Sequence, residues 1–172
     1  MSSLTHVGPE GRVRMVDVSE KTDTIRTALA TGRVILGKEA FDKVADNSIQ
    51  KGDVLAVAQF AGIMGAKETS RLVPLCHTVQ LSGIDVELSL DEALSSVDVR
   101  AYAKSVGPTG VEMEALTAVS ISCLTIYDMC KSVSKGIVIQ DIQLLAKKGG
   151  QSGDYRKEKR TVTNNGDNDE TR

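Results

Sequence analysis

Two stretches decide the fold, TVQLSGIDVELSL at residues 78–90 and SSVDVRAYAKSV at residues 95–106. In each of them apolar and polar residues alternate, which is the pattern of a β-strand with one buried face. The two stretches are neighbours in the chain, so we predict that they pair as an antiparallel hairpin. Gly83 interrupts the first stretch and indicates a β-bulge.

The rest of the chain is assigned by the spacing of its apolar residues. Helical spacing marks four segments, at residues 18–32, 37–47, 52–70 and 110–130. In the first segment Ser19 is the expected N-cap and Gly32 the expected stop. The segment 52–70 is apolar nearly all round, so we expect a buried helix. RVILG (33–37) and GIVIQDIQLLAK (136–147) are expected to be strands.

Helices and strands mix without a strict βαβ repeat. The predicted fold class is therefore α+β, with helices packed on one face of a mainly antiparallel sheet. A chain of 172 residues suits a single domain. We divide it into a flexible leader at 1–11, one folded domain at 12–150, and a polar tail at 151–172 that we expect to be disordered.

Composition narrows the classes of function. The net charge is −2, aromatic residues make up 3% and Trp is absent, so neither a basic surface nor a stacking platform for nucleic acid is expected. There is no apolar leader and no long apolar run, which predicts a cytoplasmic protein without a membrane segment. The three cysteines match no zinc spacing, and Cys123 and Cys130 are expected to face the core.

The long helix at 110–130 carries several candidate residues. Asp128 and Lys131 are three apart and share a face, either as a surface ion pair or as part of a site. Thr109 and Glu112 have the spacing of a capping box. Glu114 and Asp128 fall on one stripe, but 14 residues of helix rise about 21 Å. If both are functional, either the ligand is long or each site takes residues from two chains.

Cations flank the predicted helices and the closing strand: Arg26, Lys51, Lys67, Lys147 and Lys148. Taken singly, each lysine reads as a solvated surface charge. Lys147 and Lys148 precede GGQSG (149–153), whose small residues let backbone N–H groups approach a phosphate. Arg26, placed on the first helix, is able to clamp a phosphate through its guanidinium.

One histidine stands in an apolar run, LVPLCHTVQL at residues 72–81. Pro74 disfavours helix at Val73. If the run is extended, Cys76 and His77 point to opposite faces, which argues against a joint metal site and against a nucleophile–base pair. His77 is then either a hydrogen-bonded structural residue or a ligand contact, and the residues alone leave both readings open.

Four segments together resemble one family of proteins. They are MVDVSEKTDTIRTALATGRV (15–34), GIMGAKETSRLVPLCHTVQLSGIDVEL (62–88), GPTGVEMEALTAVSISCLTIYDMCK (107–131) and LLAKKGGQSGDYR (144–156). They resemble the signatures of the cyclic pyranopterin monophosphate synthases, the C proteins of molybdenum cofactor biosynthesis. Gln151 is a departure, because the family commonly has Lys at that position.

The resemblance implies a reaction and a set of roles. The family converts 3′,8-cyclo-7,8-dihydroguanosine 5′-triphosphate into cyclic pyranopterin monophosphate and releases pyrophosphate. The positions that match its catalytic residues are Asp128, Lys51 and Lys131. Those that match its substrate contacts or look like further pocket members are Arg26, Lys67, Leu75, Cys76, His77, Glu112, Met113, Glu114 and Lys147. No resident metal or cofactor is implied, and whether Mg²⁺ accompanies the triphosphate is left open.

The resemblance also implies a ferredoxin-like fold and a homohexamer, built as a trimer of dimers with sites at the dimer interface. Two other functions compete with this interpretation. One is a non-catalytic domain that binds a small anion and regulates a partner. The other is a metal-dependent phosphohydrolase, for which two histidines form a poor ligand set.

Overall fold

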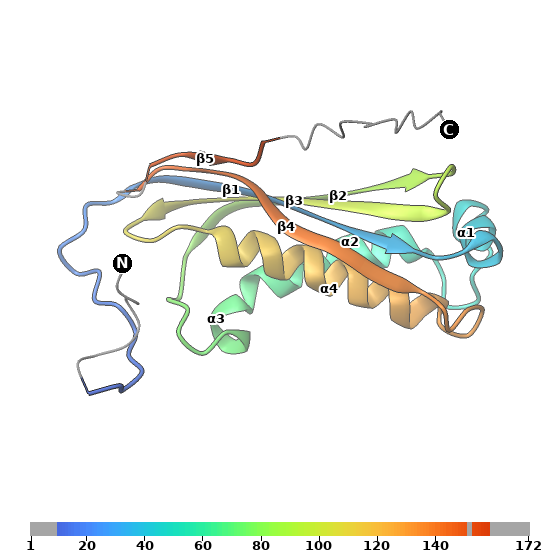
Figure 1. Cartoon of the computed structure of the whole chain (residues 1–172), viewed down its shortest axis with the longest axis horizontal. Coiled ribbons are helices and arrows are strands. Elements are labelled where there is room, and N and C mark those ends of the chain that lie inside the picture. The colour runs from blue at the N-terminus through green and yellow to red at the C-terminus, as the bar shows by residue number, and fades with distance from the viewer. Residues whose placement is uncertain (1–9, 151–152, 159–172) are drawn as a thin grey trace, which may run out of the picture.

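The fold is a five-stranded sheet covered on one face by helices (Figure 1). The computed structural model describes residues 10–150 and 153–158. Its elements are β1 (Thr24–Ile35), α1 (Lys38–Ala45), α2 (Val54–Lys67), α3 (Thr69–Leu72), β2 (Leu81–Asp91), β3 (Ser96–Gly107), α4 (Glu112–Cys130), β4 (Val138–Lys148) and β5 (Tyr155–Arg156). The strand order is β2-β3-β1-β4-β5, with antiparallel pairing throughout. The predicted α+β, ferredoxin-like class is confirmed.

The hairpin predicted from residues 78–106 is present as β2 and β3. The two strands run antiparallel from Leu81↔Ser105 to Asp91↔Ser96, and the register shifts between Leu81 and Gly83. The predicted bulge at Gly83 is therefore confirmed. On β3 every second residue from Val97 to Gly107 is buried and the residues between them are partly or fully exposed, so that one face packs on the helices and the other faces away from them.

The helix predicted over 18–32 is wrong, because β1 occupies Thr24–Ile35. Every second residue from Arg26 to Val34 is buried, which is the period of a strand. Ser19 is not an N-cap: its backbone N–H and its hydroxyl both donate to Asp17. The short strand predicted at 33–37 is the end of β1, and Arg26 lies on a strand rather than on a helix.

Gly32 shows why this segment is a strand. It was expected to stop a helix, but it lies in mid-strand beneath α4. A Cβ at this position would lie 2.6 Å from Cγ1 of Val119 and 3.1 Å from Cγ1 of Ile142. Glycine is therefore needed at this point because the backbone of β1 approaches the side chains of α4 and β4 closely.

Helix α4 is the central helix of the protein: it packs against β1, β3 and β4, and α2 lies beside it against β2 (Figure 1). The residues at its centre are small or β-branched and fully buried, among them Ala118, Val119 and Cys123. Against α2, a Cβ at Gly62 would lie 2.2 Å from Oγ of Ser122, and that hydroxyl donates to the carbonyl of Ala58 at 2.9 Å. The two helices therefore contact at backbone distance, which fixes the direction of α4.

The environment of α4 accounts for its apolar composition. By length and hydropathy it is the one helix of the described residues that is able to cross a membrane, but half of it is buried within the protein. Its buried residues pack against the sheet and α2, which is the character of a core helix. Cys123 and Cys130 lie in this core as predicted, and burial raises the pKa of their thiols to about 12 and about 11.

Helix α2 is present as predicted, but the expectation that it is wholly buried is wrong. Its Ala58, Gly62 and Ala66 face the core. Phe60 is 66% exposed, and Val57 and Met64 are also exposed. One side of this apolar helix is therefore uncovered in the single chain.

Candidate functional site

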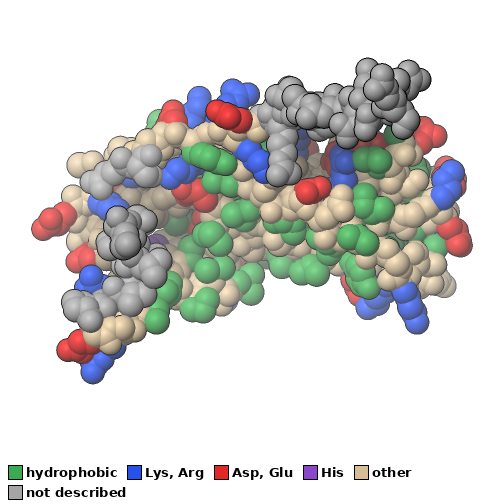
Figure 2. Space-filling view, viewed as in Figure 1, with side chains coloured by type: hydrophobic (Ala, Val, Ile, Leu, Met, Phe, Trp, Pro, Cys, Tyr) green, Lys and Arg blue, Asp and Glu red, His purple; other side chains and the backbone are tan. Residues whose placement is uncertain are grey.

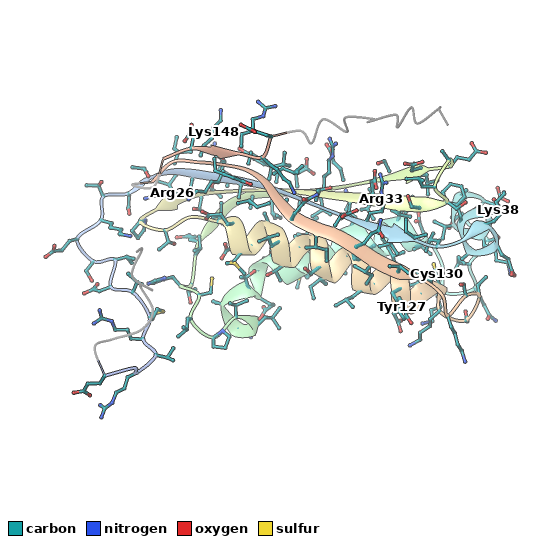
Figure 3. The ribbon with its side chains drawn as sticks, in the orientation of Figure 1. Arg26, Arg33, Lys38, Tyr127, Cys130 and Lys148 are labelled. Atoms are coloured by element: carbon teal, nitrogen blue, oxygen red, sulfur yellow. The ribbon has the colours of Figure 1, made fainter. Side chains whose placement is uncertain are left out.

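The predicted site residues gather at the two ends of α4. In Figure 3, Arg26 and Lys148 lie toward the N-terminal end of this helix, and Tyr127 and Cys130 lie at its C-terminal end. Helix α4 has 19 residues. The 14 residue steps from Glu114 to Asp128 rise about 21 Å. The candidate residues therefore form two separate clusters within one chain.

The cluster at the C-terminal end joins Asp128 to two lysines. Nζ of Lys131 lies 2.6 Å from Oδ1 of Asp128, which confirms the predicted pair, and Nζ of Lys51 lies 2.8 Å from Oδ2. Lys51 also donates to the backbone carbonyl of Asp128 at 2.9 Å. The side chain of Asp128 is 56% exposed, so this cluster is open to solvent in the single chain.

The local backbone explains how Lys51 reaches the end of α4. Gly52 has a φ of 101°, a conformation that favours glycine. Asp53 is the N-cap of α2, and its carboxylate accepts from the N–H of Ala56 at 2.9 Å. The turn before α2 is therefore fixed on both sides, and it directs Lys51 toward Asp128.

Electrostatics keep the Lys51–Asp128–Lys131 cluster charged. The hydrogen bonds and charges of Lys131 and Lys51 lower the pKa of Asp128 to about 2. The pKa of Lys131 is raised, chiefly by its hydrogen bond to Asp128 and by that carboxylate's charge. Two ammonium groups against one carboxylate leave a net positive charge, which suits an anionic ligand.

At the N-terminal end of α4, Glu112 is held by a strand and not by a cap. Oε1 of Glu112 lies 3.1 Å from Nζ of Lys147 on β4. The N-cap is Val111, and within the described part of the chain no side chain caps this end of the helix. The capping box predicted from Thr109 and Glu112 is therefore wrong. Lys147 reaches Glu112 because its cross-strand partner, Ala28, is a buried residue of β1 that faces the helices.

Arg26 fixes the loop that leads into α4. It is 7% exposed; its Nε donates to the carbonyl of Gly107, and its Nη2 donates to that of Pro108, each at 3.1 Å. On the other side, a Cβ at Gly150 would lie 2.0 Å from Nη1 of Arg26. The turn after β4 therefore packs directly on the guanidinium. Gln151, where the sequence departs from the family pattern, lies outside the described residues.

A hollow opens beside this end of the helix. Its wall includes Leu75, Cys76, His77 and Met113, together with the loop residues Thr109 and Gly110. Val73 is extended, as Pro74 predicts, and α3 ends before it. The segment 73–80 is a loop and not a strand, and both Cys76 and His77 contribute to the same hollow. Nε2 of His77 lies 2.7 Å from the carbonyl oxygen of Val16.

Glu114 is a buried carboxyl behind this hollow. It is 3% exposed, and its Oε2 has no hydrogen-bond partner among the residues that the structure describes. Burial raises its pKa, and the charge of Glu112 adds to the effect. The pKa of the Cys76 thiol is also raised, first by burial and then by the charges of Glu114 and Glu112. The carboxyl groups of Glu114 and Glu112 are therefore close enough to Cys76 to affect the pKa of its thiol.

Lys67 belongs to neither cluster. It is exposed at the C-terminal end of α2 and makes no ion pair within residues 10–150 and 153–158. In the same part of the chain, no three His, Cys, Asp or Glu side chains are placed to hold a metal ion. The donor groups at both ends of α4 are therefore lysines, carboxylates and one imidazole, a set suited to proton transfer and to binding anions.

Comparison with known proteins agrees with this arrangement. The model of the MoaC family matches residues 15–150 of the chain. The chain belongs to the MoaC family. The match includes every element from β1 to β4, and it includes both clusters of site residues.

Individual MoaC relatives are similar over nearly the whole chain. A cyclic pyranopterin monophosphate synthase of Salinibacter ruber is 59% identical over 155 residues, which are 90% of this chain and 91% of that protein. A protein of the same name from Heliobacterium modesticaldum is 55% identical, over 92% of this chain and 99% of its own length. The human molybdenum cofactor biosynthesis protein 1 is 53% identical over 90% of this chain, but the match spans 24% of that protein.

The structure adds residues that sequence reasoning missed. Val16 and Asp17 belong to MVDVSEK, a segment quoted for the MoaC resemblance, and they precede the helix predicted over 18–32. Val16 contacts His77 directly, and Asp17 folds the backbone next to it. The spacing of MVDVSEK gives no sign of this contact, because its partner lies 61 residues further along the chain.

Proposed function

We propose that this chain is a cyclic pyranopterin monophosphate synthase, a phosphorus–oxygen lyase of molybdenum cofactor biosynthesis. It would convert 3′,8-cyclo-7,8-dihydroguanosine 5′-triphosphate into cyclic pyranopterin monophosphate and release pyrophosphate. The observation that carries this proposal is 59% identity, over 90% of the chain, to a protein of that name, with a family match that includes both ends of α4.

The Lys51–Asp128–Lys131 cluster is proposed as the catalytic group. Lys131 and Lys51 lower the pKa of Asp128 to about 2, so the carboxylate is ionised near neutral pH and would accept a proton as it is released in the transition state. Lys51 and Lys131 lie beside it and would stabilise negative charge on the phosphates as the cyclic phosphate closes and pyrophosphate leaves. An incoming phosphate oxygen would replace a carboxylate oxygen as a partner of either lysine.

The hollow at the other end of α4 is proposed to bind the purine-derived ring system. Leu75 and Met113 supply apolar surface, and His77 supplies a polar group on the same wall. Glu112 and Lys147 form an ion pair next to this wall, and each is able to exchange its partner for a polar group of the ligand. Arg26 holds the loop that carries Thr109 and Gly110, so its role in binding is proposed to be indirect.

The active site is proposed to form between two copies of the chain. One nucleotide-sized ligand cannot touch both clusters in a single chain, because about 21 Å of helix separates Glu114 from Asp128. A second copy would bring its own open cluster to the hollow of the first. We extend the proposal to a homohexamer, a trimer of dimers, as the family resemblance implies.

An uncovered apolar surface supports the association of copies. The exposed large apolar side chains on α2 and α4 include Val57, Phe60, Met64 and Leu124. Figure 2 shows hydrophobic side chains gathered along the lower edge of the molecule, where Figure 1 places α2 and α4. Contiguous apolar surface of this kind is typical of an interface between proteins.

The proposed chemistry uses the protein's own lysines, carboxylates and imidazole and requires no resident metal. Mg²⁺ would arrive only with the triphosphate. We further propose a cytoplasmic location, since the substrate is a charged nucleotide derivative.

The test supplies the cyclised dihydroguanosine triphosphate to the purified chain. Pyrophosphate release and pterin fluorescence after oxidation are followed together, with and without EDTA. The proposal predicts that both signals appear in wild type and that both disappear in Asp128→Ala. Binding of the nucleotide without release of pyrophosphate would instead identify a non-catalytic ligand-binding domain.

A further inference from the structure

The segment before β1 packs against the loop that carries His77. The carbonyl oxygen of Val16 lies 2.7 Å from Nε2 of His77. Val18 and Asp23 of the same segment line a second hollow on this side of His77, together with Thr78. The imidazole therefore borders two hollows, one of them lined in part by residues of the N-terminal segment.

The contact with Val16 determines which ring nitrogen of a neutral His77 carries the hydrogen. A carbonyl oxygen accepts hydrogen bonds and cannot donate them, so Nε2 must be the donor. In a neutral imidazole with hydrogen on Nε2, Nδ1 has a free lone pair. Within residues 10–150 and 153–158, Nδ1 makes no hydrogen bond. It is thus available as an acceptor for a ligand.

Asp17 holds the backbone that presents the Val16 carbonyl. Its Oδ1 accepts from the N–H of Ser19 at 2.9 Å and from the hydroxyl of Ser19 at 2.6 Å. The N–H of Lys21 then donates to the carbonyl of Val18 at 3.0 Å, which continues the turn. These bonds from Ser19 lower the pKa of Asp17, so the carboxylate remains ionised while it holds the turn.

We propose that Asp17 is a positioning residue, whose turn holds the Val16 carbonyl against Nε2 of His77 and so leaves Nδ1 as the acceptor for an N–H or O–H group of the ligand. A guanosine-derived ligand carries such donors on its base and on its ribose. The role toward the ligand rests on the proposed function. The tautomer of His77 does not depend on the proposed function, and it is measurable without any substrate.

The first test is the nitrogen NMR spectrum of the imidazole in the full-length ¹⁵N-labelled chain at a pH where His77 is neutral. The chain has only two histidines, and a His6→Gln variant assigns the signals. We expect a protonated-type shift for Nε2 and a lone-pair-type shift for Nδ1 of His77. The opposite pattern in wild type would overturn the proposal outright.

Two substitutions of Asp17 distinguish the effect of its hydrogen bonds to Ser19 from the effect of its negative charge. Asp17→Ala removes the acceptor for both bonds from Ser19, and we expect the two nitrogen shifts to move toward each other as the tautomers mix. Asp17→Asn keeps an oxygen at the same place, and we expect the wild-type pattern. An unchanged spectrum in Asp17→Ala, in a protein that melts like wild type, would contradict the proposal. Ser19→Ala removes one of the two bonds and should give a smaller shift in the same direction.

Steady-state kinetics test whether the tautomer of His77 affects binding of the ligand. With the cyclised dihydroguanosine triphosphate as substrate, Asp17→Ala should raise KM about tenfold, which is the loss of about one hydrogen bond. The rise in KM should exceed any fall in kcat. In a His77→Ala background Asp17→Ala should have no further effect, since Asp17 acts through that imidazole. An equal further loss in that background would refute the positioning role. Absence of turnover in wild type with the expected NMR pattern would reject the proposed function alone.

Discussion

The two ends of α4 carry the same kinds of side chain in opposite environments. At the N-terminal end, Glu114 is buried and the pKa of its carboxyl is raised. At the C-terminal end, Asp128 is 56% exposed, and two lysines lower its pKa to about 2. The comparison shows that the surroundings set the state of a carboxyl group: burial favours the neutral form, and neighbouring cations favour the charged one.

The two ends also differ in what each of them lacks. The N-terminal end is enclosed by two loops and by β4. It has little net charge, because Glu112 is paired with Lys147 and Arg26 donates to loop carbonyls. The C-terminal end has charge but no enclosing wall. If the two ends meet across a pair of chains, as we propose, each supplies what the other does not have.

Removing the carboxylate of the open end should have the largest effect. Asp128→Ala should lower kcat by about a thousandfold or more, because it removes the proposed acid–base group. The protein should still fold, since the side chain is exposed. Turnover and thermal melting of the same preparation test this prediction.

A matched control for that variant is Asp42→Ala. It also breaks an exposed carboxylate–lysine pair, Lys38–Asp42 on α1, which makes no hydrogen bond or ion pair with the Lys51–Asp128–Lys131 cluster within the described residues. Its turnover should equal that of wild type. Comparable losses in both variants would mean that a broken surface pair is enough to explain the result at Asp128.

Removing the arginine of the enclosed end should mainly affect stability. Arg26→Ala leaves the carbonyls of Gly107 and Pro108 without their donors, and we expect a loss of about 3 kcal/mol in the free energy of unfolding. Urea denaturation at pH 7 measures this loss. Arg26→Lys keeps the charge but not the two-carbonyl contact, so it should also be destabilising. A fully stable Arg26→Lys would show that the charge alone matters.

The buried carboxyl should make the enclosed end sensitive to pH. The folded state raises the pKa of Glu114 above its ordinary value of 4.5, so it binds the proton more tightly than the unfolded chain does. Stability should therefore fall as pH rises from about 4.5 to the raised pKa, by about 1.4 kcal/mol for each pKa unit. Glu114→Gln lacks this proton, so it should gain stability relative to wild type between pH 4 and pH 8.

Denaturation of wild type and Glu114→Gln at several pH values tests that difference. Glu92→Gln is the control, because Glu92 is an exposed carboxylate in the β2–β3 turn. Its difference from wild type should not grow in the same way. A constant difference for Glu114→Gln would mean that the carboxyl is as well solvated in the fold as in the unfolded chain.

Much of the fold follows from the sequence, and the exceptions have a physical cause. The β2–β3 hairpin, α1, α2, α4 and β4 follow from hydrophobic periodicity. The segment 24–35 does not, because Ile25, Ala28 and Leu29 also fit a helical stripe. Its strand state is decided by tertiary contacts, above all by the room that Gly32 leaves for Val119.

The site was predicted as a set of residues but not as an arrangement. The Asp128–Lys131 pair follows from helical spacing. Lys51 lies 77 residues from Asp128, and Glu112 meets Lys147 only through the register of β1 and β4. Spacing along the chain cannot show contacts that depend on how the elements pack. The contact of His77 with Val16 is missed for the same reason.

The central claim is that the two ends of α4 form one site across two chains, and mixing two inactive variants tests it most directly. One variant carries Asp128→Ala, and the other carries Glu112→Ala with His77→Ala. Denatured together and refolded, they should regain about a quarter of wild-type activity, because half of the pairs are mixed and each mixed pair has one intact site. If the two folded variants are mixed under conditions in which they do not exchange subunits, no activity should appear. If the co-refolded mixture forms mixed oligomers and stays inactive, both clusters must act within one chain and the account is wrong.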